Sequence, residues 1–189
     1  MIRGFFFDLD GTLVDTHRAN YRAYKQALAD FGFEIEWQDF QKSIGHQART
    51  FLPWFAPGLS AASYGQIADK KKEYYRSEIA HTNLNIRLVK FMESMKPSHK
   101  IALVTTAKRE NAEAVLKHHG LSEYFDIVIT AEDVSQSKPN PECYKLALKR
   151  ASLQPKEVVA FEDSSVGVVA AEKAGIAVIK IEGFYSDAS

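Results

Sequence analysis

The sequence predicts an α/β fold in which helices flank a parallel β-sheet and an all-helical insertion follows the first strand. Three observations support this prediction. Residues 4–7 form a short apolar run that ends in two carboxylates, Asp8 and Asp10. Beyond residue 84, strand and helix patterns alternate, as they do in a parallel sheet built from βαβ units. The region between these two parts carries helical patterns and no convincing strand.

The first predicted strand places two acidic residues at the edge of the sheet where ligands bind. An all-apolar run closed by Gly11 is typical of a strand buried on both faces of a parallel sheet, so Asp8 and Asp10 lie at its carboxyl end. Two carboxylates this close repel each other unless a cation or a shared proton separates them. One can attack as a nucleophile and the other can transfer a proton, with a divalent metal holding the geometry. A plain turn is the alternative, whereas a calcium loop is excluded because Ala19 stands where such a loop carries its Glu.

Residues 16–85 are expected to form an insertion made of helices alone. Asp15 or Thr16 can cap its first helix. The later helices are expected over residues 36–43, 46–55 (broken at Pro53) and 60–81. The lysines at positions 70–72 are expected to form a solvated face of the last of these helices.

The remainder of the chain is expected to complete the sheet. Further strands are expected over residues 101–105, 126–130, 158–161 and 176–181. Helices are expected over residues 86–96, 109–119, 141–151 and 165–174. Right-handed crossovers between the parallel strands would place helices on both faces of the sheet. The predicted domains are therefore an α/β core of residues 1–15 plus 86–189 and a helical domain of residues 16–85.

Four stretches resemble the ordered motifs of one enzyme family. The segment DLDGTLVDT, residues 8–16, is similar to the first motif of the haloacid dehalogenase (HAD) superfamily of phosphotransferases, in its β-phosphoglucomutase-like and phosphoglycolate-phosphatase-like branch. The other matching stretches are residues 101–105, Ser137-Lys138-Pro139, and Phe161-Glu162-Asp163-Ser164 with Gly167 and Ala174-Gly175. The resemblance implies a Rossmann-like core with an inserted helical cap of the C1 type, which closes over the catalytic edge and selects the substrate.

The resemblance also implies a role for each catalytic residue. Asp8 would attack phosphorus and become an aspartyl phosphate, while Asp10 would protonate the leaving alkoxide and later deprotonate water. Thr105 can donate its hydroxyl to a phosphoryl oxygen; the alternative is an ordinary β-branched strand residue. Lys138 lies in a segment made rigid by prolines and can bridge nucleophile and phosphate; the alternative is one solvated lysine among many.

Metal ligands and further substrate contacts are implied in the same way. Because the ligands are hard oxygens, the expected cofactor is Mg²⁺. The expected ligands are Asp8, the backbone carbonyl of Asp10, and Asp163, with Glu162 bound directly or through water. Thr106 is an expected accessory contact to the substrate. Arg49 falls in the cap region where sugar-phosphate mutases of this branch carry an arginine for the distal phosphate.

Composition narrows the range of partners. The chain has 24 basic and 24 acidic residues, so it lacks the basic excess on which nucleic-acid and membrane surfaces rely. No apolar run approaches the ~20 residues that span a bilayer, and the N-terminus lacks the pattern of a secretory signal. The single cysteine, Cys143, fits a reducing compartment. We therefore expect a cytoplasmic protein, a monomer or weak dimer, that acts on a small phosphorylated metabolite.

Three functions remain open from the sequence. The first is a Mg²⁺-dependent phosphatase that acts through an aspartyl phosphate, the second a phosphosugar mutase, and the third a catalytically idle relative that only binds phosphorylated ligands. A mutase must delay attack by water, and in β-phosphoglucomutases a hinge histidine takes part in that control. Here the matching position is Asn20, although His17 lies three residues earlier. Asn20 favours hydrolysis, and the complete set of motif residues favours an active enzyme.

Overall fold

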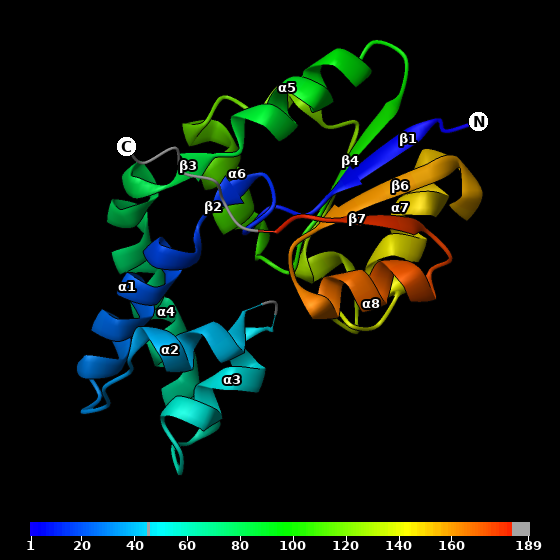
Figure 1. Cartoon of the computed structure of the whole chain (residues 1–189). Helices are drawn as coiled ribbons and strands as arrows, with labels where there is room; N and C mark the ends of the chain where they lie inside the picture. Colours follow the sequence, from blue (N-terminus) through cyan, green and yellow to red (C-terminus); the bar gives the residue numbers. More distant parts are fainter. Residues whose placement is uncertain (45, 183–189) are drawn as a thin grey trace. The chain divides into compact units, whose positions relative to one another are not determined.

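The computed structural model describes residues 1–44 and 46–182, and the chain forms two compact units (Figure 1). One unit comprises Met1–Asp15 and the chain from Asn83 onward, and it contains strands and helices. The other unit, Thr16–Thr82, contains only helices and their connections among its described residues. Residues 83–85 were expected in the helical domain, and in the structure they belong to the α/β unit.

A five-stranded parallel sheet forms the centre of the α/β unit. Its strands, in spatial order, are β5 (Ile127–Ile129), β4 (Lys100–Val104), β1 (Gly4–Phe7), β6 (Val158–Glu162) and β7 (Ala177–Lys180). The prediction of five parallel strands is confirmed. Phe7 pairs with Leu103 on one side and with Phe161 on the other, so β1, β4 and β6 end together at one edge of the sheet.

Helices cover both faces of this sheet, as predicted (Figure 1). The helices of the α/β unit are α5 (Ile86–Met95), α6 (Arg109–His118), α7 (Glu142–Ala151) and α8 (Ser165–Lys173). Because side chains alternate along a strand, Phe6 faces the buried residues of α7 and α8, while its neighbour Phe5 packs against Phe91 of α5 with ring centroids 5.1 Å apart. Burial of both faces explains why β1 carries no polar residue.

A second, two-stranded ribbon was not predicted. β2 (Val14–Asp15) pairs antiparallel with β3 (Asn83–Leu84). The expectation that residues 16–85 contain no strand is therefore wrong for residues 83 and 84. Two residues per strand are too few to show an alternating pattern in the sequence. The side-chain amide of Asn85 donates to the Thr12 carbonyl at 3.2 Å and adds a further link between the same two segments.

The helical unit has its own apolar core. Its helices are α1 (His17–Ala29), α2 (Trp37–Phe40), α3 (Ala48–Phe55) and α4 (Ala61–Glu78). Tyr24 and Leu28 of α1 pack in one cluster with Phe51 and Leu52 of α3 and Ile67 of α4. None of the helices in the described part of the chain is both long enough and apolar enough to cross a membrane.

Two expectations about this unit are wrong. Pro53 lies inside α3 and does not break it; the carbonyl that loses its hydrogen-bond donor belongs to Arg49, an exposed residue at which water can take the donor's place. Lys71 is buried and not part of a solvated face, because its ammonium lies 3.9 Å from the ring centroid of Tyr75 and 5.1 Å from that of Tyr24.

Short 3-10 helices complete the chain. They are η1 (Gln41–Ser43), η2 (Ile79–His81), η3 (Ser122–Tyr124), η4 (Ala131–Asp133) and η5 (Pro155–Glu157). The one that bears on the site is η4, because it opens the connection from β5 to α7 in which Lys138 lies.

Candidate active site

The register of the sheet brings Asp8 beside the ends of its two neighbouring strands. The backbone N–H of Asp8 donates to the carbonyl of Phe161 at 3.0 Å, which continues the pairing of β1 with β6 by one residue. The next residue along β6 is Glu162, and the last residue of β4 is Val104. Asp8 and Glu162 are both buried. Two acidic side chains therefore share the carboxyl edge of the sheet, as the sequence predicted.

Lys138 joins these two carboxylates. Its ammonium donates to Oδ1 of Asp8 at 2.7 Å, to Oε1 of Glu162 at 2.6 Å and to the carbonyl of Val104 at 2.8 Å. These three contacts use all three donors of the ammonium group. Because only 2% of the Lys138 side chain is exposed, the alternative of an ordinary solvated lysine is excluded.

The charges of the site shift the pKa values of its members. Burial raises the pKa of Asp8 well above its ordinary value; Lys138 opposes this rise, and Glu162, Asp163 and Asp10 add to it. Burial by itself lowers the pKa of Lys138, but the carboxylates of Asp8 and Glu162 outweigh it and raise the pKa above its ordinary value. Lys138 therefore remains a cation at neutral pH, next to an excess of negative charge.

The acidic cluster fits a divalent cation. Asp8, Glu162 and Asp163 each offer a carboxylate oxygen, and these oxygens lie within 4.8 Å of one another. If all three are ionised, one ammonium leaves two negative charges uncompensated. Oε2 of Glu162 is buried and has no hydrogen-bond partner among the described residues. Hard oxygen donors with an excess charge of this size suit Mg²⁺.

Two buried threonines belong to the connections at this edge of the sheet. The buried hydroxyl of Thr12 donates to Oδ1 of Asp163 at 3.4 Å, a contact that the sequence did not indicate. Thr105 directly follows β4 and is buried; its backbone N–H donates to the carbonyl of Ile129 at 2.9 Å. Its hydroxyl oxygen accepts from the N–H of Ala107 at 3.0 Å, so the hydroxyl hydrogen remains available to a ligand.

Asp10 lies in a tight turn that follows Asp8. Gly11 has a φ of 83°, a left-handed conformation that favours glycine, and its N–H donates to the carbonyl of Val14 at 2.8 Å. The carbonyl of Leu9 accepts from the backbone N–H of Val14 at 3.0 Å, which closes the turn. This turn keeps the Asp10 carboxylate close enough for its charge to affect Asp8.

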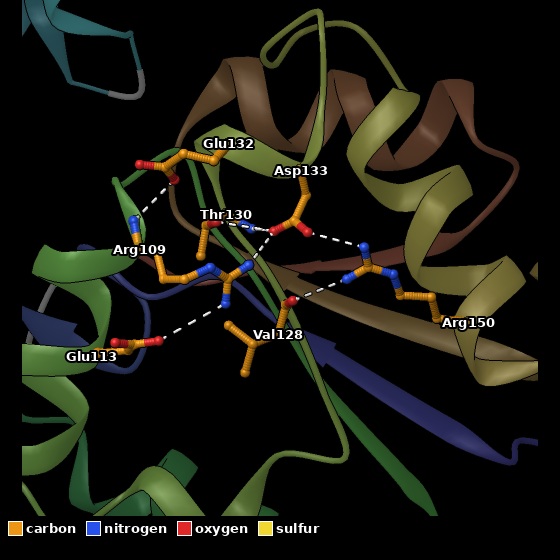
Figure 2. A network of polar contacts seen from close by, with 7 residues as sticks. All are labelled: Arg109, Glu113, Val128, Thr130, Glu132, Asp133 and Arg150. Atoms are coloured by element: carbon orange, nitrogen blue, oxygen red, sulfur yellow. Dashed lines mark hydrogen bonds and ion pairs between the residues drawn. The ribbon is translucent and has the colours of Figure 1, made fainter.

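A network of ion pairs connects two loops at the same edge (Figure 2). Asp133 of η4 accepts from the guanidinium of Arg109 at 2.6 Å and from that of Arg150 at 2.9 Å. The same carboxylate accepts from the backbone N–H and the hydroxyl of Thr130, both at 2.9 Å. Glu132 accepts from the backbone N–H of Arg109 at 3.0 Å and so caps α6 from a neighbouring loop.

This network bears on the site through the loops that it joins. Thr105 and Thr106 lie between β4 and α6, and Lys138 lies between β5 and α7. The backbone N–H of Ala131 also donates to the carbonyl of Ala107 at 3.0 Å. The two loops are thus tied together by backbone and side-chain contacts.

Tyr144 is a part of the site that the sequence did not reveal. It lies on α7, is fully buried, and its hydroxyl donates to Oε1 of Glu162. On the sequence, Tyr144 belongs to an apolar helix face with Cys143 and Ala147, so its pattern indicates only core packing. No local pattern could pair this hydroxyl with a carboxylate 18 residues further along the chain.

The predicted site residues thus fall into two groups. Asp8, Lys138, Glu162 and Asp163 form one contact cluster, with Asp10, Thr105 and Thr106 in the adjoining turn and loop. Arg49 lies on α3 in the helical unit and is exposed; its contact with a distal phosphate stays a prediction.

Known proteins resemble the chain over most of its length. The family described as haloacid dehalogenase-like hydrolase matches residues 5–181. A phosphorylated carbohydrates phosphatase of Thermotoga maritima is 32% identical over an alignment of 175 residues, and the match covers 90% of this chain and 80% of that protein. The fructose-1-phosphate phosphatase YqaB of Escherichia coli is 30% identical over an alignment of 182 residues, and the match covers 94% of this chain and 95% of that protein.

A solved structure shares the fold as well. The crystal structure of β-phosphoglucomutase from Clostridium difficile has a TM-score of 0.85 with this chain at 26% sequence identity, and the match covers 97% of this chain and 86% of that one. The similar proteins therefore include phosphatases and a mutase, which are the two active functions left open by the sequence.

Proposed function

Because the chain belongs to the haloacid dehalogenase-like hydrolase family, we propose that it is a Mg²⁺-dependent phosphatase that hydrolyses a small phosphorylated metabolite through an aspartyl phosphate. The observation that carries this proposal is the buried ammonium of Lys138, held between Asp8 and Glu162. A phosphate dianion can approach a carboxylate only where positive charge is fixed in place. Lys138 supplies such a charge at the nucleophile.

The chemistry requires two steps. In the first, a carboxylate oxygen of Asp8 forms a bond to phosphorus, the ester O–P bond breaks, and Asp10 gives its proton to the leaving alkoxide. In the second, Asp10 takes a proton from a water molecule that attacks the phosphorus, inorganic phosphate leaves and Asp8 is restored. The Thr105 hydroxyl donates to the phosphoryl group and orients it. The Lys138 ammonium attracts this group by its charge and can exchange one of its three protein acceptors for a phosphoryl oxygen, and Thr106 is an accessory contact.

Mg²⁺ would be held by Asp8, Asp163, the backbone carbonyl of Asp10, and Glu162 directly or through water. When bound, it neutralises negative charge on the phosphoryl group and on the acidic cluster. The excess of carboxylates over ammonium groups in this cluster supports the assignment.

Sugar phosphates are the proposed substrates, with phosphoglycolate-type esters as the other class. The names of the two phosphatases similar to this chain, one of phosphorylated carbohydrates and one of fructose 1-phosphate, support this choice. We also propose a cytoplasmic location, which the buried free Cys143 supports, and a monomeric or weakly dimeric state.

A mutase is the second candidate, and the similarity to a solved β-phosphoglucomutase supports it. Against it stands Asn20, which cannot exchange a proton near neutral pH at the position where β-phosphoglucomutases carry a histidine.

The test of the proposed function is phosphate release from a broad panel of phosphate esters, with and without Mg²⁺. A hexose 1-phosphate with catalytic hexose bisphosphate is included, and both products are followed. Free phosphate that appears only with Mg²⁺ supports the phosphatase. Rapid formation of the 6-phosphate with little free phosphate would show a mutase instead, and no turnover of any ester would show an idle relative.

A further inference from the structure

One oxygen atom of Glu162 accepts hydrogen bonds from two buried donors. The ammonium of Lys138 donates to Oε1 at 2.6 Å, and the hydroxyl of Tyr144 donates to the same atom. The ring centroid of Tyr144 lies 5.4 Å from this ammonium. Because all three residues are buried, water replaces neither donor readily. The contacts of Oε1 are therefore set by these two side chains.

The three acceptors of the Lys138 ammonium differ in what each keeps when the ammonium leaves. In the described part of the chain, Oδ1 of Asp8 and the carbonyl of Val104 have no side-chain donor besides Lys138. Oε1 of Glu162 keeps the hydroxyl of Tyr144. Since a buried acceptor without a donor costs free energy, Glu162 is the acceptor that the ammonium leaves at the smallest cost.

The other oxygen of this carboxylate has no donor that could take over. Oε2 of Glu162 is buried and has no hydrogen-bond partner among the described residues. It lies against Gly167 of α8, where an added Cβ atom would overlap it. Once the ammonium has left Oε1, the hydroxyl of Tyr144 is thus the one side-chain donor that the described residues still offer to Glu162.

We propose that Tyr144 is a positioning residue for phosphate binding: its hydroxyl holds Oε1 of Glu162 while the Lys138 ammonium exchanges that oxygen for a phosphoryl oxygen. This inference rests on the proposed function, in which Lys138 contacts the phosphoryl group. The ammonium keeps its hydrogen bonds to Asp8 and Val104, so the cation stays beside the nucleophile. Without the Tyr144 hydroxyl, the same exchange leaves a buried carboxylate with no side-chain donor, which opposes phosphate binding.

Tyr144→Phe tests this proposal because it removes one oxygen atom and keeps the buried ring. Binding of inorganic phosphate is measured by isothermal titration calorimetry at saturating Mg²⁺. The expected result is a dissociation constant about tenfold higher than that of the wild type, since a hydrogen bond to a charged group is lost only in the bound state. The matched control is Tyr124→Phe, which removes a hydroxyl that donates to the exposed carboxylate of Glu93 at 2.7 Å. The control is expected to bind phosphate as the wild type does.

Kinetics separate positioning from packing. The exchanged contact is present both in bound substrate and in the transition state, so its loss should raise KM and leave kcat unchanged. In Tyr144→Phe, KM for a phosphate ester is expected to rise about tenfold, while kcat stays within about twofold of the wild type. A fall in kcat with unchanged phosphate affinity would overturn the proposal, because Tyr144 would then support packing alone.

A double-mutant cycle tests whether Tyr144 acts through the charge of Glu162. In the Glu162→Gln background, Tyr144→Phe is expected to weaken phosphate binding by no more than about threefold, since the exchange then leaves no charge without a donor. Equal losses in both backgrounds would overturn the proposal. A wild-type protein that neither binds phosphate nor hydrolyses any ester would refute the proposed function itself, whereas equal phosphate binding by wild type and Tyr144→Phe would refute only the role of Tyr144.

Discussion

Lys138 is held by three protein acceptors, two of which are buried carboxylates that would otherwise repel each other. Removing one partner of a buried ion pair leaves an uncompensated charge in a medium that solvates it poorly. Lys138→Met keeps an unbranched side chain of similar length and removes the ammonium, with its charge and its three hydrogen bonds. We predict a loss of about 3–5 kcal/mol in the free energy of unfolding at neutral pH in EDTA, measured by urea titration.

Lys70→Met is the control for this prediction. Lys70 also pairs with a carboxylate, that of Asp30 at 2.7 Å, but both side chains are partly exposed at 46% and 32%. Exposed ion pairs contribute little to stability, so this variant should unfold as the wild type does. Equal stability of the Lys138 and Lys70 variants would contradict the assignment of Lys138 as the charge that holds the site together.

Asp8 gives the cation-free protein a specific dependence on pH. Burial raises the pKa of its carboxyl above the ordinary 3.8, with Lys138 opposing the rise and Glu162 adding to it. A carboxyl whose pKa is higher in the folded than in the unfolded chain stabilises the fold when protonated. That contribution is present below the unfolded pKa and is lost as the pH rises through the folded pKa.

The Asp8→Asn variant removes this titration. In EDTA, we predict that the free energy of unfolding of Asp8→Asn increases relative to that of the wild type as the pH rises from about 4 to about 8. Urea unfolding across this range measures the difference. If the difference between the two free energies of unfolding stayed constant with pH, this would contradict the raised pKa of Asp8. Added Mg²⁺ should reduce the trend, because the cation stabilises the ionised carboxylate.

At the scale of the elements, Asp133 is the residue that ties α6 and α7 to the end of β5 (Figure 2). In Asp133→Asn, an NH₂ group replaces one carboxylate oxygen and faces Arg109 or Arg150. This group can only donate hydrogen bonds, and so can the guanidinium that it faces. We predict a loss of about 1–3 kcal/mol in the free energy of unfolding, because a hydrogen-bond donor of the network loses its acceptor. Water replaces this acceptor poorly, since the Asp133 side chain is only 12% exposed.

The control for Asp133 is Asp39→Asn. Asp39 pairs with Lys42 at 2.7 Å, but its side chain is 55% exposed and its partner is only three residues further along the chain. Its loss should leave the denaturation midpoint unchanged. If the Asp133 variant behaved in the same way, the network would be a surface feature with no part in holding the Thr105 and Lys138 loops.

The elements themselves could largely be predicted from the sequence. The five strands of the sheet could be predicted because each contains an apolar run between turn residues, and the acidic pair follows directly after β1. β2 and β3 escaped prediction because two residues carry no periodicity, and their pairing joins positions about 70 residues apart. Pro53 and Lys71 were misjudged because tertiary surroundings, and not local propensity, decide whether a helix tolerates them.

The site could be predicted only in part. Its acidic residues and Lys138 stand at strand ends or in a distinctive loop, so position along the chain indicates where they meet. Tyr144, Thr12 and Asp133 act through contacts with residues distant in sequence, and no spacing rule pairs them in advance. The role of Arg49, on the helical unit, stays a prediction.

At the scale of the whole molecule, the central claim is that Asp8 becomes phosphorylated during turnover. Asp10→Asn makes this intermediate observable, because an activated aryl phosphate can transfer its phosphoryl group without a proton, while attack of water on the aspartyl phosphate still needs a base. Acid quenching of this variant with an aryl phosphate, followed by mass spectrometry of the peptides, measures the result most directly. We predict one added phosphoryl group on Asp8 and none in the Asp8→Asn, Asp10→Asn double variant. Phosphorylation at another residue, or turnover of the aryl phosphate by the double variant at the rate of Asp10→Asn alone, would contradict the account.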